Sequence, residues 1–251
     1  MNSILYEELS MNAHPALKTQ LYDGWVLRFS NGYTNRANSV NPLYQGSIPI
    51  REKVAVCEEK YMREDLPAVF KLTDASPAAI DVYLDTQGYE KVTPTNLFTL
   101  DALPLQQDTG KTVIFTPIDS SWREHYFRLN GLIDVQKMQT ASAMMDSIQN
   151  TAICAHIEAD GHTIACGLCV VERGYAGLYD IVVDSEHRRK GFGYDLCRAL
   201  LAEAGKHGAK SAYLQVVAAN APAVALYKKL GYQHNYQYWY RVKDGRRKPE
   251  A

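Results

Sequence analysis

Hydrophobic positions follow two clear periods in the second half of this 251-residue chain. Residues 179–183 form a run of aromatic and β-branched side chains, which is typical of a buried strand, and Asp184 ends it with turn chemistry. Beyond this turn, Phe192, Leu196 and Leu200 recur every four residues, which predicts one apolar helical face. The pattern therefore predicts a strand, a short loop and a helix.

Similar patterns predict the other elements of the second half. Asp119 or Ser120 can cap a helix over residues 122–129, and a second helix is expected over residues 135–148. Strands are expected at residues 112–115, 151–158, 163–172, 175–183 and 213–216.

The first half shows alternation that predicts a hairpin. Residues 25–29 alternate in polarity, residues 30–32 are turn formers, and the second strand is expected over residues 33–40. A helix beginning near Ile50 has an expected apolar face of Val54, Cys57, Tyr61 and Met62. A strand at 68–72, a helix at 77–86 and a strand at 92–100 follow.

The loop between residues 184 and 193 has the composition of an anion site. Arg188, Arg189 and Lys190 supply formal positive charge, and Gly191 and Gly193 have no Cβ to keep a phosphate from the backbone. The first amides of a helix have no intrahelical partner, and the helix dipole adds partial positive charge there. The alternative is an ordinary strand-to-helix turn with solvated basic residues.

A second motif follows this helix. The strand at 213–216 precedes Asn220, and the next helix ends in Leu226-Tyr227-Lys228-Lys229-Leu230-Gly231-Tyr232. The order Arg-x-x-Gly-x-Gly, strand, Asn, helix, Leu-Tyr-x-x-x-Gly-aromatic resembles the acyl-CoA-binding motifs of the GNAT superfamily of N-acetyltransferases. The resemblance covers about residues 111–240.

This resemblance implies acetyl-CoA as the cosubstrate. The pyrophosphate would lie on the loop, and the pantetheine arm would hydrogen-bond the end of the preceding strand like an added strand. In the family this strand separates from its neighbour to admit the arm. The residues implied in cosubstrate binding are Ile181, Val182, Val183, Arg188, Arg189, Lys190, Gly191, Phe192, Gly193 and Asn220.

The same resemblance gives Tyr227 a catalytic role. A tyrosine at this place lies near the sulfur in the family and can protonate the departing thiolate. Asn220 and Tyr227 are seven residues apart, so they share one side of the helix. The alternative makes Tyr227 a core aromatic and Asn220 a plain N-cap.

No residue stands out as the general base. Many relatives carry a Glu on the strand before the phosphate loop, but the matching position here is Gly177. Asp180 is the nearest carboxylate on that strand and is our candidate. Glu172 at the end of the preceding strand, or an ordered water, are the alternatives.

The first half repeats the order of elements of the second half without its chemistry. Gly88-Tyr89 corresponds to Gly231-Tyr232, 143 positions later, which indicates an internal repeat, although two strand–helix units can match by chance. In that alignment Pro77 stands where Asn220 stands and Leu84 where Tyr227 stands. The loop at 41–49 has no Arg-x-x-Gly-x-Gly.

We therefore predict an α/β protein with two GNAT-like halves, each a mostly antiparallel central sheet flanked by helices. Residues 1–105 would be a degenerate N-terminal domain and residues 111–251 the acyl-CoA-binding domain, with Leu103 to Lys111 as the linker.

Composition limits the partners. The net charge is −1, with 27 Lys and Arg against 28 Asp and Glu, so a nucleic-acid partner is not expected. The five cysteines include Cys166-x-x-Cys169 inside an apolar run, which favours buried free thiols over a metal site. No signal peptide or apolar run of membrane length occurs, so we expect no membrane partner and a cytoplasmic monomer or homodimer.

The predicted activity is transfer of an acetyl group from acetyl-CoA to a primary amine of a small molecule. Direct attack in a ternary complex is expected, because no cysteine looks like an exposed nucleophile. A protein lysine or N-terminal acceptor is one alternative, and a non-catalytic acyl-CoA sensor is another. The aromatic residues Tyr236, Tyr238, Trp239 and Tyr240 either line the acceptor side or are ordinary strand residues.

Overall fold

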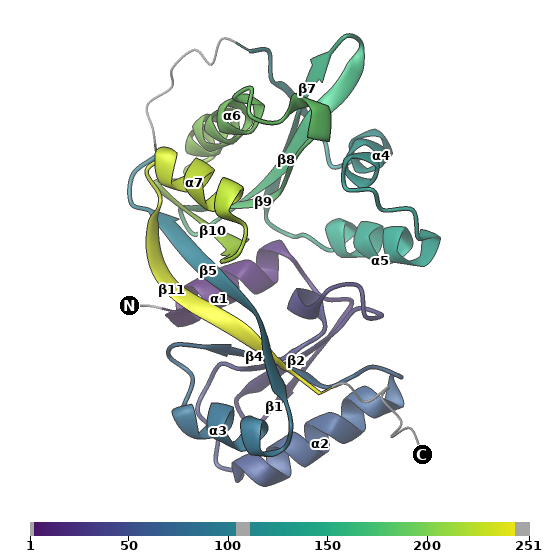
Figure 1. Ribbon diagram of the computed structural model, residues 1–251, viewed down its shortest axis with the longest axis vertical. Coiled ribbons are helices and arrows are strands. Elements are labelled where there is room, and N and C mark those ends of the chain that lie inside the picture. The colour runs from purple at the N-terminus through teal and green to yellow at the C-terminus, as the bar shows by residue number, and fades with distance from the viewer. Residues whose placement is uncertain (1–2, 104–110, 244–251) are drawn as a thin grey trace. The chain divides into compact units, whose positions relative to one another are not determined.

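The computed structural model describes residues 3–103 and 111–243, which contain both helices and strands (Figure 1). The chain divides into unit 1, which contains Met1–Asn96, Val217–Ala219 and Tyr236–Ala251, and unit 2, which contains Leu97–Val216 and Asn220–Asn235. The strands β5 (Glu90–Leu100) and β11 (Gln233–Val242) have residues in both units. The domain boundaries at 105 and 111 stay a prediction, and residues 104–110 of the predicted linker lie outside the described residues.

The sheet of unit 1 follows the strand order β1-β2-β3-β4-β11. Its first four strands are β1 (Lys18–Tyr22), β2 (Trp25–Phe29), β3 (Val40–Pro42) and β4 (Val69–Thr73), and its helices are α1 (Ser3–Ala13), α2 (Ile50–Arg63) and α3 (Ala78–Thr86). Most neighbours are antiparallel, but β3 and β4 are parallel and share only the partner pair Val40 and Phe70. These two strands therefore diverge beyond that pair.

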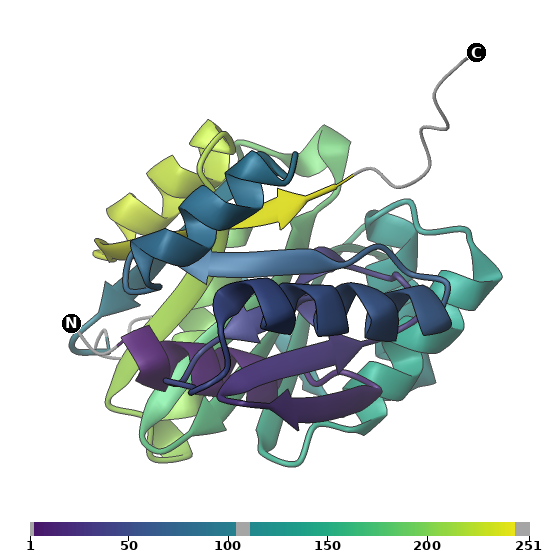
Figure 2. The same ribbon diagram turned by 90° about the horizontal axis from the view of Figure 1, so that it is seen from below.

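Strand β4 separates an apolar face from a charged one. Phe70 and Leu72 are fully buried in one apolar cluster with residues of α2 and α3, and these two helices lie together on one side of the sheet (Figure 2). Lys71 lies between them and points to the other face, since successive strand residues alternate. There its Nζ lies 2.5 Å from Glu7 Oε2 of α1, and both side chains are only 3% exposed.

The hairpin predicted from residues 25–29 is confirmed in part. Strand β2 pairs antiparallel with the returning chain, with Trp25 opposite Pro42 and Leu27 opposite Val40. A further hairpin, which was not predicted, joins β1 to β2 through Asp23 and Gly24, whose φ angles are +43° and +81°. Because β1 is exposed along most of its length, it has no hydrophobic alternation to mark it. The strand expected over residues 33–40 is instead a 3₁₀ helix at Asn35–Ala37, followed by the short β3. Met62, expected on the apolar face of α2, is 71% exposed.

Unit 2 contains the elements predicted for the second half. Its sheet follows the order β5-β10-β9-β8-β7-β6, with antiparallel pairing from β6 to β9 and parallel pairing of β9 with β10. The strands are β6 (Ile114–Thr116), β7 (Thr151–Ala159), β8 (His162–Glu172), β9 (Tyr175–Val183) and β10 (Ser211–Val217), and the helices are α4 (Ser120–Leu129), α5 (Val135–Asp146), α6 (Phe192–Lys206) and α7 (Ala221–Lys229). The prediction of an α/β fold with mostly antiparallel sheets flanked by helices is confirmed.

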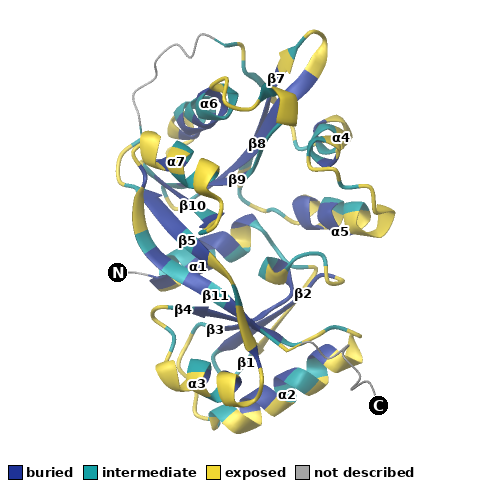
Figure 3. Ribbon diagram, viewed as in Figure 1, coloured by how far each residue is buried: buried dark blue, intermediate teal, exposed yellow. Residues whose placement is uncertain are grey.

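Helices α4 and α6 cover opposite sides of the same strands in unit 2 (Figure 1). The apolar face of α6, with Leu196 and Leu200, is completely buried, as Figure 3 shows by its dark-blue inner side. On the other side, Trp122 of α4 donates from Nε1 to the carbonyl of Ala155 at 3.2 Å. Asp119 caps α4 as predicted, because its Oδ1 accepts from the Trp122 amide.

The buried ion pair of unit 1 gives a stability prediction. Glu7→Gln keeps the side-chain shape but leaves the Lys71 charge buried without its carboxylate, which costs about 3–5 kcal/mol when one partner of such a pair is removed. Urea unfolding should show this loss. Glu8→Gln is the control: Glu8 is only partly buried and accepts an exposed hydrogen bond from Tyr44 Oη, which a glutamine can also accept, so a change within about 0.5 kcal/mol is expected. Equal losses in both variants would contradict the assignment.

Candidate active site

The candidate site of unit 2 begins where two parallel strands part. β9 and β10 pair from Tyr175 opposite Ser211 to Leu178 opposite Leu214, although β9 continues to Val183. On the other side, the end of β9 stays paired with β8. Within the described register, the last residues of β9 therefore have one backbone edge that β10 does not use. This is the arrangement that admits an extended ligand beside a strand.

A bulge in β9 lies at this point. The register with β8 jumps, because Cys166 is opposite Val182 and Leu168 is opposite Tyr179. Asp180 has a φ of +53°, which a residue other than glycine adopts only under constraint. Gly167 of β8 makes room for the bulge, since a Cβ there would lie 2.6 Å from Ile181 Cδ1. Bulges of this kind re-aim a side chain and occur next to active sites.

The bulge turns Asp180 toward helix α4. Its Oδ1 accepts a hydrogen bond from Tyr126 Oη at 3.0 Å. The Tyr126 ring stacks on Trp122, with centroids 5.7 Å apart and planes only 2° apart. Tyr126 is a residue that sequence reasoning missed, because 54 positions separate it from Asp180.

Glu172, the other candidate base, is the last residue of β8 and lies opposite Tyr175 at the start of β9, away from the bulge. Glu172 accepts from Asn150 Nδ2 at 3.1 Å and forms an ion pair with Arg173 Nε at 3.4 Å. Gly177, which occupies the place of the Glu found in many relatives, faces two tyrosines. A Cβ there would lie 2.6 Å from Tyr213 Cζ, and Tyr179 Oη donates to Tyr213 Oη at 2.9 Å. A carboxylate at position 177 is therefore excluded by the tyrosine pair.

The glycine loop has left-handed backbone at two positions. Arg189 and Gly191 have φ angles of +64° and +86°, and Gly191 is the N-cap of α6. The basic side chains of residues 188–190 are exposed, and Arg188 Nε donates to the carbonyl of Val183 at 3.2 Å. The amides at the start of α6 and the exposed cations thus lie beside the end of β9, as an anion site requires.

Helix α7 meets this loop at Gly193. A Cβ on Gly193 would lie 3.4 Å from both Leu226 Cδ2 of α7 and Val183 Cγ2 of β9. The loop, the strand end and the helix that carries Tyr227 therefore converge. Asn220 is the N-cap of α7, because its Oδ1 accepts from the Ala223 amide at 3.2 Å. This capping uses only Oδ1, so the amide nitrogen can still donate to a ligand.

Tyr227 lies in the core of unit 2. It is 8% exposed, and its ring meets that of Tyr232 edge to face, with centroids 6.1 Å apart. Burial, with a smaller effect from neighbouring Cys197, raises the pKa of Tyr227 well above its usual range. The phenol therefore stays protonated at neutral pH.

The five cysteines are all buried and free, so none is an exposed nucleophile. Burial raises the pKa of Cys57, Cys166 and Cys197 to about 12. It also raises the pKa of Cys154 and Cys169. A thiolate is the reactive form, and these surroundings disfavour it.

In unit 1, the carboxylate of Asp23 binds backbone amides just before a helix begins. Asp23 accepts from the amides of Ser47 at 2.9 Å and Ile48 at 2.8 Å, just before α2 begins, and Lys53 Nζ lies 3.1 Å from Oδ2. These hydrogen bonds hold the pKa of Asp23 well below its usual range. Sequence reasoning missed Asp23, although Asp-Gly is a strong turn pair.

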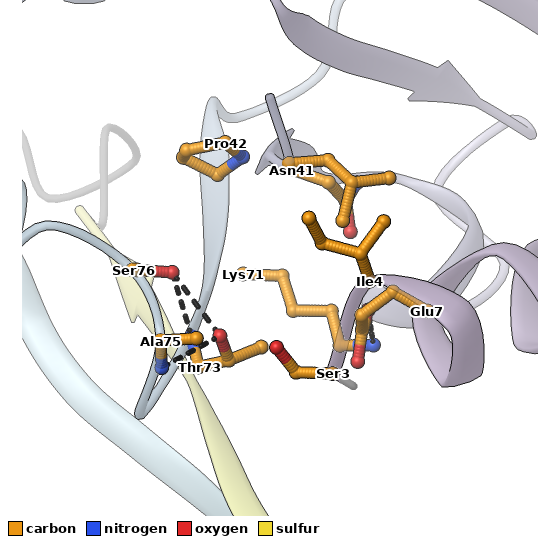
Figure 4. A pocket seen from close by; sticks show the side chains of 10 residues that line it. Ser3, Ile4, Glu7, Asn41, Pro42, Lys71, Thr73, Ala75 and Ser76 are labelled. Carbon is orange, nitrogen blue, oxygen red and sulfur yellow. Dashed lines mark hydrogen bonds and ion pairs between the residues drawn. The ribbon is translucent and has the colours of Figure 1, made fainter. Parts of the chain in front are cut away.

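A pocket of about 290 Å³ lies where β3 and β4 diverge in unit 1 (Figure 4). Ser3, Ile4 and Glu7 of α1 form one wall, and Asn41 and Lys71 lie on the strands. Side chains of α1 thus line the pocket beside the two diverging strands.

The aromatic residues near the C-terminus are core residues of unit 1. Tyr236, Tyr238 and Tyr240 are 1%, 1% and 4% exposed, and β11 pairs with β4. Tyr236 Oη donates to Glu7 Oε1 at 2.7 Å, and Lys71 Nζ lies 3.9 Å from the Tyr238 ring centroid. These three tyrosines are therefore ordinary strand residues, which was the second of the two interpretations of the sequence.

Within residues 3–103 and 111–243, no helix is long and apolar enough to cross a bilayer. In the same ranges, no group of three or more His, Cys, Asp or Glu side chains is placed to hold a metal ion.

Comparison with known proteins identifies relatives along nearly the whole chain. A family model described as "Probable histone acetyltransferase Rv0428c C-terminal" matches residues 5–241. "Uncharacterized N-acetyltransferase YobR" of Bacillus subtilis is 29% identical over 242 residues, which cover 94% of this chain and 97% of that protein.

A shorter sequence match and a solved structure are also N-acetyltransferases. The ribosomal protein bS18-alanine N-acetyltransferase of Escherichia coli is 36% identical over 92 residues, which cover 35% of this chain and 60% of that protein. A GCN5-related N-acetyltransferase from Kribbella flavida has a TM-score of 0.72 at 14% identity, covering 97% of this chain and 96% of its own, and it supports the fold alone.

Proposed function

Because the chain belongs to the GNAT acetyltransferase family described as probable histone acetyltransferase Rv0428c C-terminal, we propose that its unit 2 acetylates a primary amine of a small molecule with acetyl-CoA. As a member of this family, the protein is an acyltransferase. The observation that carries the proposal is the end of pairing between β9 and β10 directly before the Arg-x-x-Gly-x-Gly loop. The open edge of β9 would form one wall of an acyl-CoA site, and it leads directly into the loop that would bind the phosphates.

The cosubstrate would bind along the end of β9. Backbone groups of Ile181, Val182 and Val183 would hold the pantetheine arm, and the Asn220 amide would add a donor. The pyrophosphate would lie on the amides of Gly191, Phe192 and Gly193. The side chains of Arg188, Arg189 and Lys190 would neutralise its charge.

Asp180 is the proposed general base. The bulge and the Tyr126 hydrogen bond hold its carboxylate just beyond the last pair of β9 and β10. There it would remove a proton from the acceptor ammonium, so that the neutral amine can attack the thioester carbonyl. A new C–N bond forms, the C–S bond breaks, and CoA leaves as a thiolate. The nitrogen, which carries a positive charge after the attack, loses its second proton to solvent.

Tyr227 is the proposed general acid. Its phenol is protonated, because burial raises its pKa, and α7, which carries it, contacts the start of α6 where Leu226 meets Gly193. The phenol would protonate the CoA thiolate as the C–S bond breaks, and solvent would then reprotonate the phenolate. Direct attack is favoured over an acyl-enzyme because the five cysteines are buried.

The second candidate is acetylation of a protein lysine or N-terminus. One relative is named for an alanine of a ribosomal protein, and the family description names histones. Turnover of acetyl-CoA with a panel of small amines and of peptides separates the two acceptor classes. No turnover with any acceptor, despite tight binding, would instead favour the acyl-CoA sensor. A cytoplasmic monomer or homodimer and the degenerate role of residues 1–105 stay proposals.

The role of Tyr227 predicts a specific loss. Tyr227→Phe keeps the ring and removes the proton, so kcat should fall roughly 10- to 1000-fold while KM for acetyl-CoA changes little. Tyr232→Phe is the matched control: its hydroxyl is buried in the same core and has no described hydrogen-bond partner. It should leave kcat unchanged. A kcat for Tyr227→Phe within about twofold of wild type would remove the tyrosine from the mechanism.

The role of Asp180 predicts a different loss. Asp180→Asn keeps a side chain that can bond Tyr126 but cannot accept the amine proton. We expect kcat/KM for the amine to fall about 100- to 10,000-fold, with acetyl-CoA affinity retained. Glu172→Gln should have little effect. The opposite result for the two variants would assign the base to Glu172, and full activity in both would point to an ordered water.

A further inference from the structure

We propose that Lys111, which lies outside the glycine motif, is a further acyl-CoA-binding residue whose ammonium contacts the pyrophosphate beside Gly191. The proposal rests on the proposed function. It adds to that function a residue that the sequence assigned to the end of a linker, and it explains how an acidic residue is tolerated in the first turn of α6.

The position of Lys111 is set by three contacts with the loop and the helix start. Its Nζ lies 2.6 Å from Asp195 Oδ2 and donates to the carbonyl of Lys190 at 3.0 Å. It also lies 4.6 Å from the centroid of the Phe192 ring. A residue 84 positions away from Asp195 is thus fixed at the N-terminus of α6.

The ammonium lies beside Gly191, on the side where a side chain would project. A Cβ built on Gly191 would be 3.1 Å from Lys111 Nζ and 3.7 Å from Asp195 Oδ2. A phosphate oxygen packed against this glycine would therefore be within the usual distance of a charge-assisted hydrogen bond from Nζ. It would also lie close to a carboxylate.

That carboxylate makes the lysine necessary. Asp195 suits a helix start, because the dipole favours negative charge there, but it would repel a pyrophosphate on the same amides. Its side chain is only 12% exposed, so water screens it poorly. Lys111 neutralises the Asp195 carboxylate by forming an ion pair with it, and its ammonium would then be available to contact the ligand. Without the lysine, the glycine loop would present its amides beside an uncompensated negative charge.

The test compares the affinities of three ligands for variants of the full chain. Lys111→Gln should raise the Kd for acetyl-CoA and for 3′-dephospho-CoA about 10- to 100-fold, and the dependence of log Kd on log salt should become shallower. The Kd for S-acetylpantetheine, which has no pyrophosphate, should not change. Lys111→Arg should keep affinity within about threefold. Asp195→Asn in the Lys111→Gln background should restore part of the loss, because it removes the uncompensated charge.

The matched control is Lys206→Gln. Lys206 lies at the other end of α6 and forms an exposed ion pair with Glu203 at 2.7 Å, so it changes net charge equally without approaching the loop. It should leave all three affinities unchanged. A purely structural role of Lys111 would lower the melting temperature and weaken the three ligands alike, which would overturn the proposal.

Other outcomes also decide the matter. Tighter binding of acetyl-CoA by Lys111→Gln would mean that the lysine blocks the site. A loss confined to acetyl-CoA, with 3′-dephospho-CoA unaffected, would move the contact to the 3′-phosphate and refute the pyrophosphate assignment. Failure of the wild-type chain to bind acetyl-CoA would refute the proposed function itself, whereas equal affinity of wild type and Lys111→Gln would refute only the role of Lys111.

Discussion

The end of backbone pairing between β9 and β10 is the constraint on which the candidate site depends. Pairing stops after Leu178 and Leu214, and the bulge at Asp180 follows two residues later. One local distortion therefore has three consequences. It exposes a strand edge for an extended ligand, turns a carboxylate toward α4, and directs the chain into the loop before α6. Gly167 and Gly177 permit it, because side chains occupy the space where their Cβ atoms would lie.

Two parallel strands also diverge in unit 1, but side chains of the protein itself occupy the space between them. Its parallel strands β3 and β4 share a single partner pair, and the divergence holds side chains of the chain itself. Asp23 takes the amides before α2, and Glu7 of α1 meets Lys71 under the pocket. A buried charge is expensive unless it is paired, and Glu7 and Lys71 are paired. The proposal of one acyl-CoA site per chain fits these contacts, since a phosphate before α2 would have to displace the carboxylate of Asp23.

Local patterns in the sequence were sufficient to predict most elements and the glycine motif. Contacts between residues that are far apart in the sequence could not be predicted from such patterns. The helix α6 and strands β7 to β9 have strong periodicity or long apolar runs, so their positions could be predicted within a few residues. The edge strand β1 has no such pattern because it is mostly exposed. The partners of Asp180 and Asp195, Tyr126 and Lys111, are 54 and 84 positions away, and no local pattern links them. The reason that position 177 is glycine is visible only once Tyr213 lies against it.

The proposed acyl-CoA site is tested most directly by a calorimetric titration of the full chain with acetyl-CoA, combined with amide hydrogen exchange of the bound and free protein. We expect a stoichiometry of one, with slowed exchange at residues 181–183 and 191–193 and at the start of α7. Residues 43–50, whose loop amides Asp23 already holds, should show no change. Two equivalent sites, or protection of that loop by acetyl-CoA, would contradict the claim that only the strand separation in unit 2 binds the cosubstrate.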